Sequence, residues 1–318
     1  MSDLDALLAG IVADPHNQLR WLIIADWLDD HDQPDRAELL RLHRELIRTC
    51  CEPDAHPERA EIHARIVELI DAGVKPVVPQ HTLTLPGNVP LVGNFLPPGS
   101  FLMGGEEEEY EKPVHRVTLT KGFFAGIHPV TQAQWSAVMG TDPSHFKGDN
   151  RPVEQVSWED ATAFCATATE LTGCVVRLPT EAEWEYACRA GTTTHFHYGD
   201  APDATRINYN AKETWNGSAE GEFREQTTAL GTFPANPWGL WDCHGNVWEW
   251  CQDWYDEGYY GRSPDSDPEC QDGEQMYRVL RGGSWLDYSV DCRAASRNWG
   301  EPGSCGNYFG FRVVFCLD

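Results

Sequence analysis

Pro237-Trp-Gly-Leu-Trp-Asp-Cys-His-Gly-Asn-Val-Trp-Glu-Trp250 is the stretch that most constrains the fold, because it places four tryptophans and two glycines within 14 residues. The whole chain of 318 residues holds 13 tryptophans and 28 glycines, and only Trp21 and Trp27 precede residue 80. Indole rings supply large packing surfaces, and glycines permit sharp turns. The part of the chain beyond residue 80 is therefore expected to form a compact, irregular, aromatic-rich fold.

Regular elements are short in this larger part. Alternating runs at 114–119 and 278–280 predict strands, and helical patterns lie at 131–139, 158–172 and 180–190. Long loops at 200–236 and 253–277 separate them. Strands and helices of this kind, with helices grouped between strands, predict an α+β fold.

Two of the predicted helices begin with recognisable caps. Thr180 is followed three residues later by Glu183, and Ser157 is followed by Asp160. In this pattern the hydroxyl accepts from the third backbone N–H and the carboxylate accepts from the backbone N–H of the capping residue, so these side chains are expected to be structural.

Four arginines flank apolar residues and are expected to form ion pairs inside the domain with acids such as Glu183, Glu185 and Glu249. They are Arg177, Arg293, Arg297 and Arg312.

The first 75 residues predict a small bundle of four amphipathic helices. In the second helix the apolar positions at helical spacing, expected to face the core, are Leu19, Leu22, Ile23, Trp27 and Leu28. The next segment, 76–98, is rich in proline and predicts a linker that enters a first strand. The expected organisation is therefore a helical domain at 1–75, this linker and strand at 76–98, and a main domain at 99–318.

Charge and composition exclude several classes of function. The formal net charge is −26, so the chain repels phosphate backbones and anionic lipid, and neither nucleic acid nor membrane is an expected partner. The acidic start of the chain does not resemble a secretory signal. Eleven cysteines, an odd number without close pairing of the C-x-x-C type, are expected to be reduced, which suits the cytoplasm.

Five sequence blocks carry a resemblance to a known family. In this order they resemble the formylglycine-generating enzyme superfamily, also called the sulfatase-modifying factor family, over about residues 85–316. The resemblance implies an irregular variant of the C-type-lectin-like fold. The blocks are Pro152-Val-Glu-Gln-Val-Ser-Trp-Glu-Asp-Ala, Arg177-Leu-Pro-Thr-Glu-Ala-Glu-Trp-Glu-Tyr-Ala-Cys-Arg-Ala-Gly, Pro237 to Trp250, Arg281-Gly-Gly-Ser-Trp, and Cys292-Arg-Ala-Ala-Ser-Arg leading to Gly310-Phe-Arg.

A second resemblance covers about residues 1–50. The segments Leu4-Asp-Ala-Leu-Leu, Asp14-Pro15, Ile24-Ala-Asp-Trp-Leu-Asp-Asp and Arg36-Ala-Glu-Leu-Leu-Arg-Leu are similar to a short helical family fused before many unrelated bacterial domains. This resemblance implies an adaptor that docks another protein. The alternative is a bundle that only packs on the following domain.

The catalytic residues of the larger family are only partly present. Family oxidases use two cysteines that bind Cu(I), the first two residues after the Arg-Gly-Gly-Ser-aromatic block and the second five residues later. Here Asp287 stands at the first position, and a carboxylate is too hard a ligand to replace a thiolate on Cu(I). The second position falls on Cys292 or, if the loop is three residues shorter, on Ser289. Copper is therefore not expected, and the remaining catalytic candidates are Ser284, which matches an active-site serine, Asp287, and a relocated pair of Cys292 with Cys305.

The same resemblance supplies candidates for binding. An aromatic-rich stretch in the segment that flanks the family's cleft predicts a ligand cleft formed by Trp285, Tyr288, Arg293, Trp299, Asn307 and Tyr308. Family members can hold calcium in their long loops, which makes calcium a candidate cofactor. The matching residues are Asn246, Glu249 and Asp253 for one site and Asn208, Tyr209 and Glu222 for a second.

Two functions follow from this sequence. The first is a binding module for a peptide, a protein or a small ligand, built on the family scaffold without its copper site. The second is an oxidase, either formylglycine-generating or another superfamily oxidoreductase with a relocated site.

Overall fold

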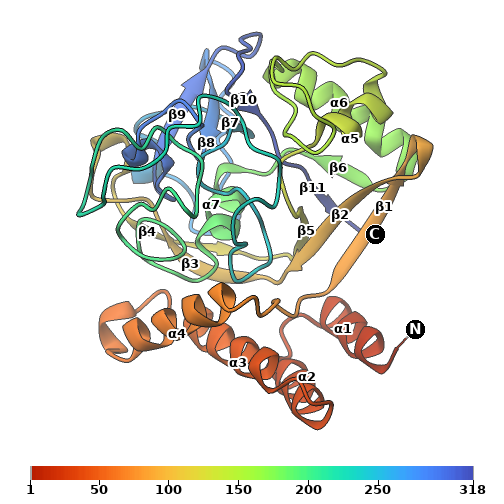
Figure 1. Cartoon of the computed structure of the whole chain (residues 1–318), viewed down its shortest axis with the longest axis vertical. Helices are drawn as coiled ribbons and strands as arrows, with labels where there is room; N and C mark the ends of the chain where they lie inside the picture. Colours follow the sequence, from red (N-terminus) through yellow and green to blue (C-terminus); the bar gives the residue numbers. More distant parts are fainter. Residues whose placement is uncertain (1, 318) are drawn as a thin grey trace.

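The computed structural model describes residues 2–317, and its N-terminal part contains the four predicted helices (Figure 1). Ser2 forms a capping box at the first helix, Asn17 caps the second, and Pro34 begins the third at the position where its missing N–H costs nothing. The helices form one layer beneath the rest of the molecule in this view. They are α1 (Asp3–Ala13), α2 (Gln18–Asp30), α3 (Pro34–Arg48) and α4 (Arg59–Asp71).

The face that α2 turns to the core differs from the prediction. Leu19, Leu22 and Ile23 are exposed, so the expectation that they face the core is wrong, whereas Leu28 of the same predicted set is buried and Trp27 packs partly buried against the core. The buried side chains are Trp21, Ile24, Ala25 and Leu28. Both sets have helical spacing, but the stripe that contains Trp21 offers the larger apolar surface, so its burial is the more favourable.

The segment predicted as a linker and first strand contains two paired strands. β1 (Gln80–Leu85) and β2 (Val89–Leu96) form an antiparallel hairpin whose turn is Pro86–Asn88, with Gly87 at φ 74°. Proline is common in turns because its φ is fixed, and glycine adopts positive φ without strain. The prolines of this segment thus mark the hairpin turn and its borders, and the main domain begins with β1.

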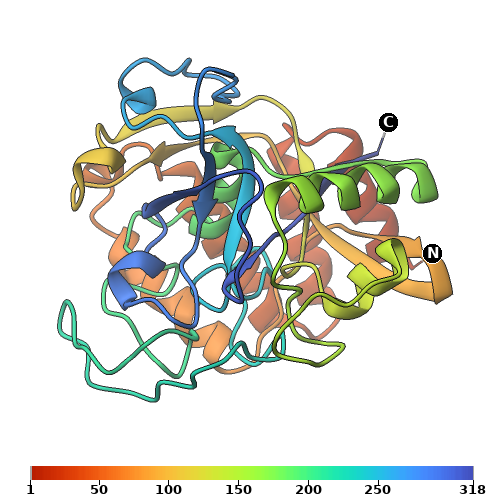
Figure 2. The same cartoon turned by 90° about the horizontal axis from the view of Figure 1, so that it is seen from above.

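The main domain contains three sheets (Figures 1 and 2). The strand orders are β1-β2-β5-β11-β6, β10-β7-β8-β9 and β3-β4. The fold is α+β, as predicted. The remaining strands are β3 (Gly99–Met103), β4 (His115–Leu119), β5 (Phe123–Gly126), β6 (Val175–Arg177), β7 (Trp248–Trp254), β8 (Arg278–Arg281), β9 (Arg297–Gly300), β10 (Phe309–Gly310) and β11 (Val314–Cys316).

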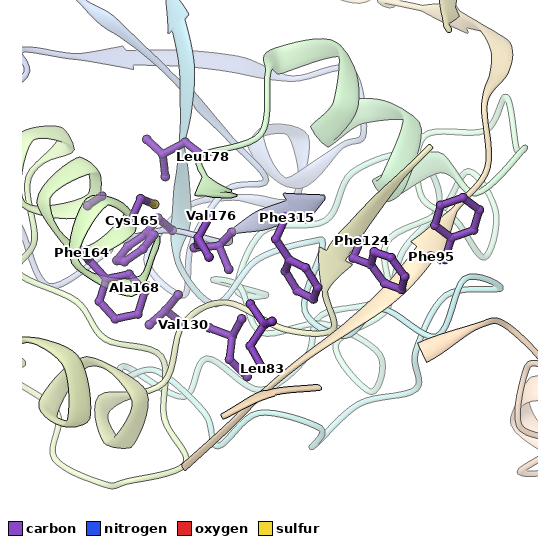
Figure 3. Close-up of a cluster of buried hydrophobic side chains, with 14 of the residues drawn as sticks. Leu83, Phe95, Phe124, Val130, Phe164, Cys165, Ala168, Val176, Leu178 and Phe315 are labelled. Carbon is purple, nitrogen blue, oxygen red and sulfur yellow. The ribbon is translucent and has the colours of Figure 1, made fainter. Parts of the chain in front are cut away.

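Three helices belong to the main domain: α5 (Gln132–Met139), α6 (Trp158–Thr172) and α7 (Glu181–Arg189). The predicted capping boxes of α6 and α7 are both formed. A cluster of apolar side chains lies between α6 and the five-stranded sheet (Figure 3). Within it the rings of Phe95 and Phe124 lie 5.3 Å apart, and those of Phe124 and Phe315 stack at the same distance.

Helix α7 lies inside the domain, and all of its residues are buried. Its carboxylates are paired with Arg189 of the same helix and with arginines from distant strands. Glu185 pairs with Arg189 at 2.7 Å and with Arg281, and Glu181 pairs with Arg297 at 2.7 Å. A buried charge is tolerated when it is paired and hydrogen-bonded, so these contacts tie α7 to the four-stranded sheet.

The predicted arginine pairs are confirmed in part. Arg177 binds Glu183 at 2.6 Å, and Arg312 binds Glu249 at 2.9 Å. Arg293 instead forms a bidentate pair with Glu111 at 2.7 and 2.9 Å, a partner 182 residues away in sequence.

The N-terminal bundle is fixed to the main domain by specific polar contacts. The His43 Nε2 lies 3.1 Å from the Ala190 carbonyl oxygen, and Arg59 donates to the Gly191 carbonyl oxygen at 2.8 Å. Asp71 forms an ion pair with Arg206. Among the helices of residues 2–317, none has the length and apolar character needed to cross a membrane.

Candidate functional site

The candidate site begins at the turn that follows β8. Gly282 and Gly283 have φ values of 95° and 72°, which L side chains rarely adopt. A Cβ on Gly283 would lie 2.5 Å from the sulfur of Cys292, so the close approach of the two segments also requires glycine. This turn places Ser284, which is fully buried, at the start of the loop that carries the candidate residues.

Ser284 and Asp287 form a hydrogen-bonded pair. The Ser284 hydroxyl donates to the Asp287 carboxylate and accepts from the Leu286 backbone N–H at 3.3 Å. The side chain of Trp248 lies near the same carboxyl and acts to lower its pKa. Ser284 and Asp287, both named as catalytic candidates from the sequence, therefore lie together in the fold.

The Asp287 carboxyl lies in a largely desolvated environment. Burial raises its pKa, and the hydrogen bond from Ser284 and the nearby side chain of Trp248 act in the opposite direction without cancelling that effect. Burial raises the pKa of neighbouring Asp291 to about 6, and the charge of Asp287 adds to this rise. No lysine or arginine of the described residues pairs with Asp287, so this carboxyl is stabilised only by neutral groups, whereas the charge of Arg293 partly offsets the rise at Asp291.

The two candidate cysteines have opposite surroundings. Cys292 is completely buried beside the glycine turn, and its thiol donates to the Tyr288 carbonyl oxygen at 3.7 Å. Burial raises the pKa of Cys292 well above its usual range, and the charges of Asp287 and Asp291 raise it further. Cys305 is exposed, and both are free cysteines. Because a thiolate is the form that binds metal, the Cys292 environment opposes a Cu(I) role.

Part of the predicted ligand cleft forms one aromatic cluster. The indole of Trp285 donates to the Asn307 carbonyl oxygen at 2.9 Å, and its ring contacts Phe146 edge-on at 5.3 Å between centroids. The Phe223 ring stacks on Trp285 with 6.2 Å between centroids. Tyr308 joins this region because its carbonyl oxygen accepts from the backbone N–H of Trp248 at 2.8 Å.

Of the two exposed residues of the predicted cleft, Tyr288 lies at the border of the aromatic cluster around Trp285, and Trp299 lies outside it. Tyr288 is exposed, and its hydroxyl interacts with Glu213, whose charge raises the pKa of the phenol. Trp299 is also exposed, but it packs on Tyr255 at 4.8 Å in another group of side chains. We define the Trp285 face as Phe146, Phe223, Trp285, Leu286 and Tyr288.

Arg293 does not belong to this face. It is almost fully buried in its pair with Glu111 and borders a cavity of about 220 Å3. That cavity is lined on its other sides by Leu102, Arg189 and His195. Arg293 therefore lines this cavity and not the Trp285 face, since a buried arginine next to an acid from another loop pairs with that acid.

The residues predicted for the first calcium site have other partners. Both oxygens of Glu249 accept from Arg312, and one also accepts from the Trp184 indole at 2.8 Å. Asp253 accepts from the backbone N–H groups of Glu181 at 2.7 Å and Cys270 at 2.9 Å, and the Asn246 amide bonds to neighbouring loop residues. These oxygens do not form a free donor set, so the arrangement does not fit calcium, and the described residues contain no group of three or more metal-binding His, Cys, Asp or Glu side chains.

The second predicted calcium site retains free oxygens. The Oδ1 atom of Asn208 and the hydroxyl of Thr228 are buried without a hydrogen-bond partner among the described residues, and so is the Tyr209 hydroxyl. Oxygen atoms of this kind are suitable ligands for calcium. Glu222, by contrast, is exposed and lies 3.4 Å from Arg224. Calcium at this position stays a prediction, with Asn208 as its best-placed residue.

Several residues of the site were not predicted from the sequence. Phe146, Phe223 and Trp248 reach Trp285 or Asp287 from three separate segments. No local pattern marks Phe146 or Phe223, because each lies in an irregular loop. Trp248 is part of the Pro237–Trp250 stretch, but its position near Asp287 depends on a contact between segments about 40 residues apart in the sequence.

Comparisons with known proteins agree with this fold. The family described as sulfatase-modifying factor enzyme 1-like domain matches residues 83–316, so the chain belongs to that family. The N-terminal helices precede the matched residues.

Among curated relatives, the formylglycine-generating enzyme of Streptomyces coelicolor is 38% identical over 198 residues, which cover 58% of this chain and 59% of the enzyme. The serine/threonine-protein kinase pkn1 of Chlamydia caviae is 33% identical over 252 residues, which cover 69% of this chain and only 37% of the kinase. Among solved structures, Treponema denticola variable protein 1 has a TM-score of 0.67 at 27% identity, with 76% of this chain and 99% of that chain covered.

Proposed function

We propose that this chain is a ligand-binding member of its family that has no copper chemistry and that presents the Trp285 face to a segment of another protein or a peptide. The observation that carries the proposal is the side chain of Asp287, which is hydrogen-bonded to Ser284 at the position where the family resemblance expects the first copper thiolate. A hard carboxylate beside a buried, protonated Cys292 does not make a Cu(I) site.

The Trp285 face has the chemistry of a recognition surface. Its rings come from three separate segments and hold one another in place, so they offer a large contact area that loses little conformational freedom on binding. Leu286 and Tyr288 are exposed beside the nearly buried Trp285. An exposed border around a fixed aromatic centre is typical of binding hot spots.

The charge around the face indicates the type of ligand. Glu213 interacts with Tyr288, and Lys212 lies over the Phe223 ring at 5.0 Å and close to Glu225. The chain as a whole carries a net charge of −26. Peptides that combine apolar or aromatic residues with Lys or Arg are therefore the expected ligands, because complementary charge favours their association. All eleven cysteines are free thiols in the fold, which supports the cytoplasm as the compartment.

Selection from a displayed peptide library on the full chain tests the proposal. We expect enrichment of peptides with aromatic and basic residues, and loss of that enrichment in the double variant Leu286→Ala/Tyr288→Ala. The matched control is Leu171→Ala/Met276→Ala, which removes two exposed apolar side chains from other parts of the surface. Equal enrichment on both variants, or none on the wild type, would contradict the proposal.

The alternative is a formylglycine-generating oxidase or another oxidoreductase of the superfamily with a relocated site, and the 38% identity to a formylglycine-generating enzyme favours it. A relocated site would have to use Cys292 with Cys305. The first is fully buried and the second is exposed. Incubation of a Cys-x-Pro-x-Arg peptide with the chain, Cu(I) and oxygen, followed by mass spectrometry, distinguishes the two functions: we expect the thiol to persist, and conversion to an aldehyde would establish the oxidase.

A further inference from the structure

Helix α2 has two apolar stripes, of which only one is buried. Trp21, Ile24, Ala25 and Leu28 face the core. On the opposite side Leu19, Leu22 and Ile23 are 66%, 51% and 51% exposed. Positions i, i+3 and i+4 are neighbours on one helix face, so these three side chains form a continuous apolar surface in solvent.

This surface differs from the other exposed apolar residues of the described chain. No other helix exposes three large apolar side chains; α6, for example, exposes only Leu171. Single exposed leucines are ordinary, but a contiguous apolar stripe on a fixed helix is typical of an interaction site.

Acidic residues continue the same helix face. Asp26 and Asp30 follow Ile23 at helical spacing, with Asp29 beside them. Arg41 of α3 lies 2.8 Å from both Asp26 and Asp29, so one guanidinium is shared by two carboxylates while Asp30 forms no ion pair. The only arginine of α2, Arg20, lies 3.5 Å from Asp14. We define the α2 outer face as Leu19, Leu22, Ile23, Asp26 and Asp30.

We infer that the α2 outer face docks an amphipathic helix of another protein, one with leucine or isoleucine at i, i+3 and i+4 and lysine or arginine at the end that meets Asp26 and Asp30. The apolar stripe provides the contact area, and the carboxylates provide electrostatic complementarity to a basic partner. A second copy of this chain is the less suitable occupant, because residues 1–75 contain 16 acidic and 8 basic residues and carry a net charge of −8.

The position of the bundle is compatible with this docking. In Figure 1, α2 lies at the lower edge of the molecule, away from the sheets of the family domain. The polar contacts of His43 and Arg59 with the family domain come from α3 and α4, so they hold the bundle in place without covering the α2 outer face. The N-terminal helices thus act as an adaptor whose site is separate from the Trp285 face.

A display library of helical peptides tests this inference on the full chain. The library fixes leucine at i, i+3 and i+4 and randomises the flanking positions among Lys, Arg, Glu, Asp and Ser. We expect enrichment of Lys and Arg at one end of the helix. The variant Leu22→Ala/Ile23→Ala should weaken binding of the selected peptide at least tenfold in fluorescence anisotropy, and Asp26→Asn/Asp30→Asn should remove the preference for basic residues.

Control measurements test whether peptide binding depends specifically on the α2 outer face. Leu171→Ala/Met276→Ala removes exposed apolar side chains elsewhere and should leave binding unchanged. Thermal unfolding of the α2 variants verifies that the bundle remains folded, as expected for exposed positions. Enrichment of acidic peptides, equal weakening in the control variant, or a dimer in sedimentation velocity that Leu22→Ala/Ile23→Ala dissociates would each overturn the inference.

Discussion

Buried ionisable groups are stabilised in two different ways in this protein. The buried arginines of the family domain are ion-paired, whereas the buried Asp287 has no cationic partner among the described residues. Arg281, Arg297 and Arg312 each lie against a carboxylate from another element. Asp287 is bound only by a hydroxyl and backbone groups and lies near an indole. The paired charges hold the scaffold together, whereas the unpaired acid lies at the position where the family resemblance expects the first copper thiolate.

The largest expected effect concerns the paired charges. Arg312→Met removes the cation from Glu249 in a site where both side chains are buried. Since an uncompensated buried charge is strongly unfavourable, we expect the free energy of unfolding to fall by about 3–5 kcal/mol. Urea unfolding followed by tryptophan fluorescence measures the loss.

Arg65→Met is the matched control for this effect. Arg65 pairs with Glu38 on the bundle surface at 2.8 Å, and both side chains are well exposed. An exposed ion pair contributes less than about 1 kcal/mol. If Arg312→Met and Arg65→Met lower the free energy of unfolding equally, the buried ion pair contributes no more to stability than an ordinary surface pair.

A second prediction uses pH to examine an unpaired acid within the scaffold. Burial raises the pKa of Asp253 to about 8, and the nearby charge of Glu181 adds to the rise. Between the unfolded pKa near 3.8 and pH 8 the folded state binds more protons than the unfolded state, so stability falls as the pH rises through this window. The slope from one such group is at most about 1.4 kcal/mol per pH unit.

Asp253→Asn should remove this contribution, because asparagine cannot ionise. Unfolding free energies at pH 5, 6.5 and 8 should therefore decline less steeply in the variant than in the wild type. Other buried acids such as Asp242, whose pKa burial raises to about 7, affect both proteins equally. Identical slopes would show that Asp253 is ionised in the folded protein.

A smaller loss of stability is expected when the glycine turn at the candidate site is altered. Gly283 and Gly140 have almost the same φ, 72° and 69°, so alanine brings similar backbone strain at both. The Cβ at Gly283 would also lie 2.9 Å from the Cα of Cys292, whereas the space around Gly140 is open. We expect Gly283→Ala to cost about 1–3 kcal/mol and Gly140→Ala about 1 kcal/mol. Thermal unfolding compares them, and equal shifts would mean that the site tolerates movement of Cys292.

The smallest effect on stability is expected at the ligand surface. Tyr288→Ala removes an exposed ring, so the free energy of unfolding should change by less than about 0.5 kcal/mol. Binding of the peptides selected on the Trp285 face should nevertheless weaken. A large loss of stability in calorimetry would show instead that Tyr288 belongs to the scaffold.

Local chemistry explains what could be predicted from the sequence. The capping boxes of α6 and α7 depend on residues three positions apart, and both were predicted. The stripe of α2 that is buried could not be predicted, because two stripes with the same spacing compete and tertiary packing selects between them. The hairpin at Pro86–Asn88 was missed for a related reason, since proline and glycine serve both linkers and tight turns.

Contacts between distant segments explain most of what the sequence could not indicate at the site. Arg293 was expected at the cleft, but its carboxylate partner Glu111 lies 182 residues away. Phe146 and Phe223 surround Trp285 from loops without periodic structure. The presence of Asp287 at the first cysteine position, in contrast, could be predicted from the sequence, because it lies two residues after the block Arg281-Gly-Gly-Ser-Trp, which fixes the register.

The measurement that tests the central claim most directly is an anaerobic Cu(I) titration of the full chain in competition with a chromophoric chelator, repeated on Cys292→Ser and Cys305→Ser. The buried, protonated thiol beside Asp287 should contribute nothing, so both variants should take up the same amount of Cu(I) as the wild type. Loss of one equivalent of tightly bound Cu(I) in both variants would demonstrate a two-thiol site and contradict the account.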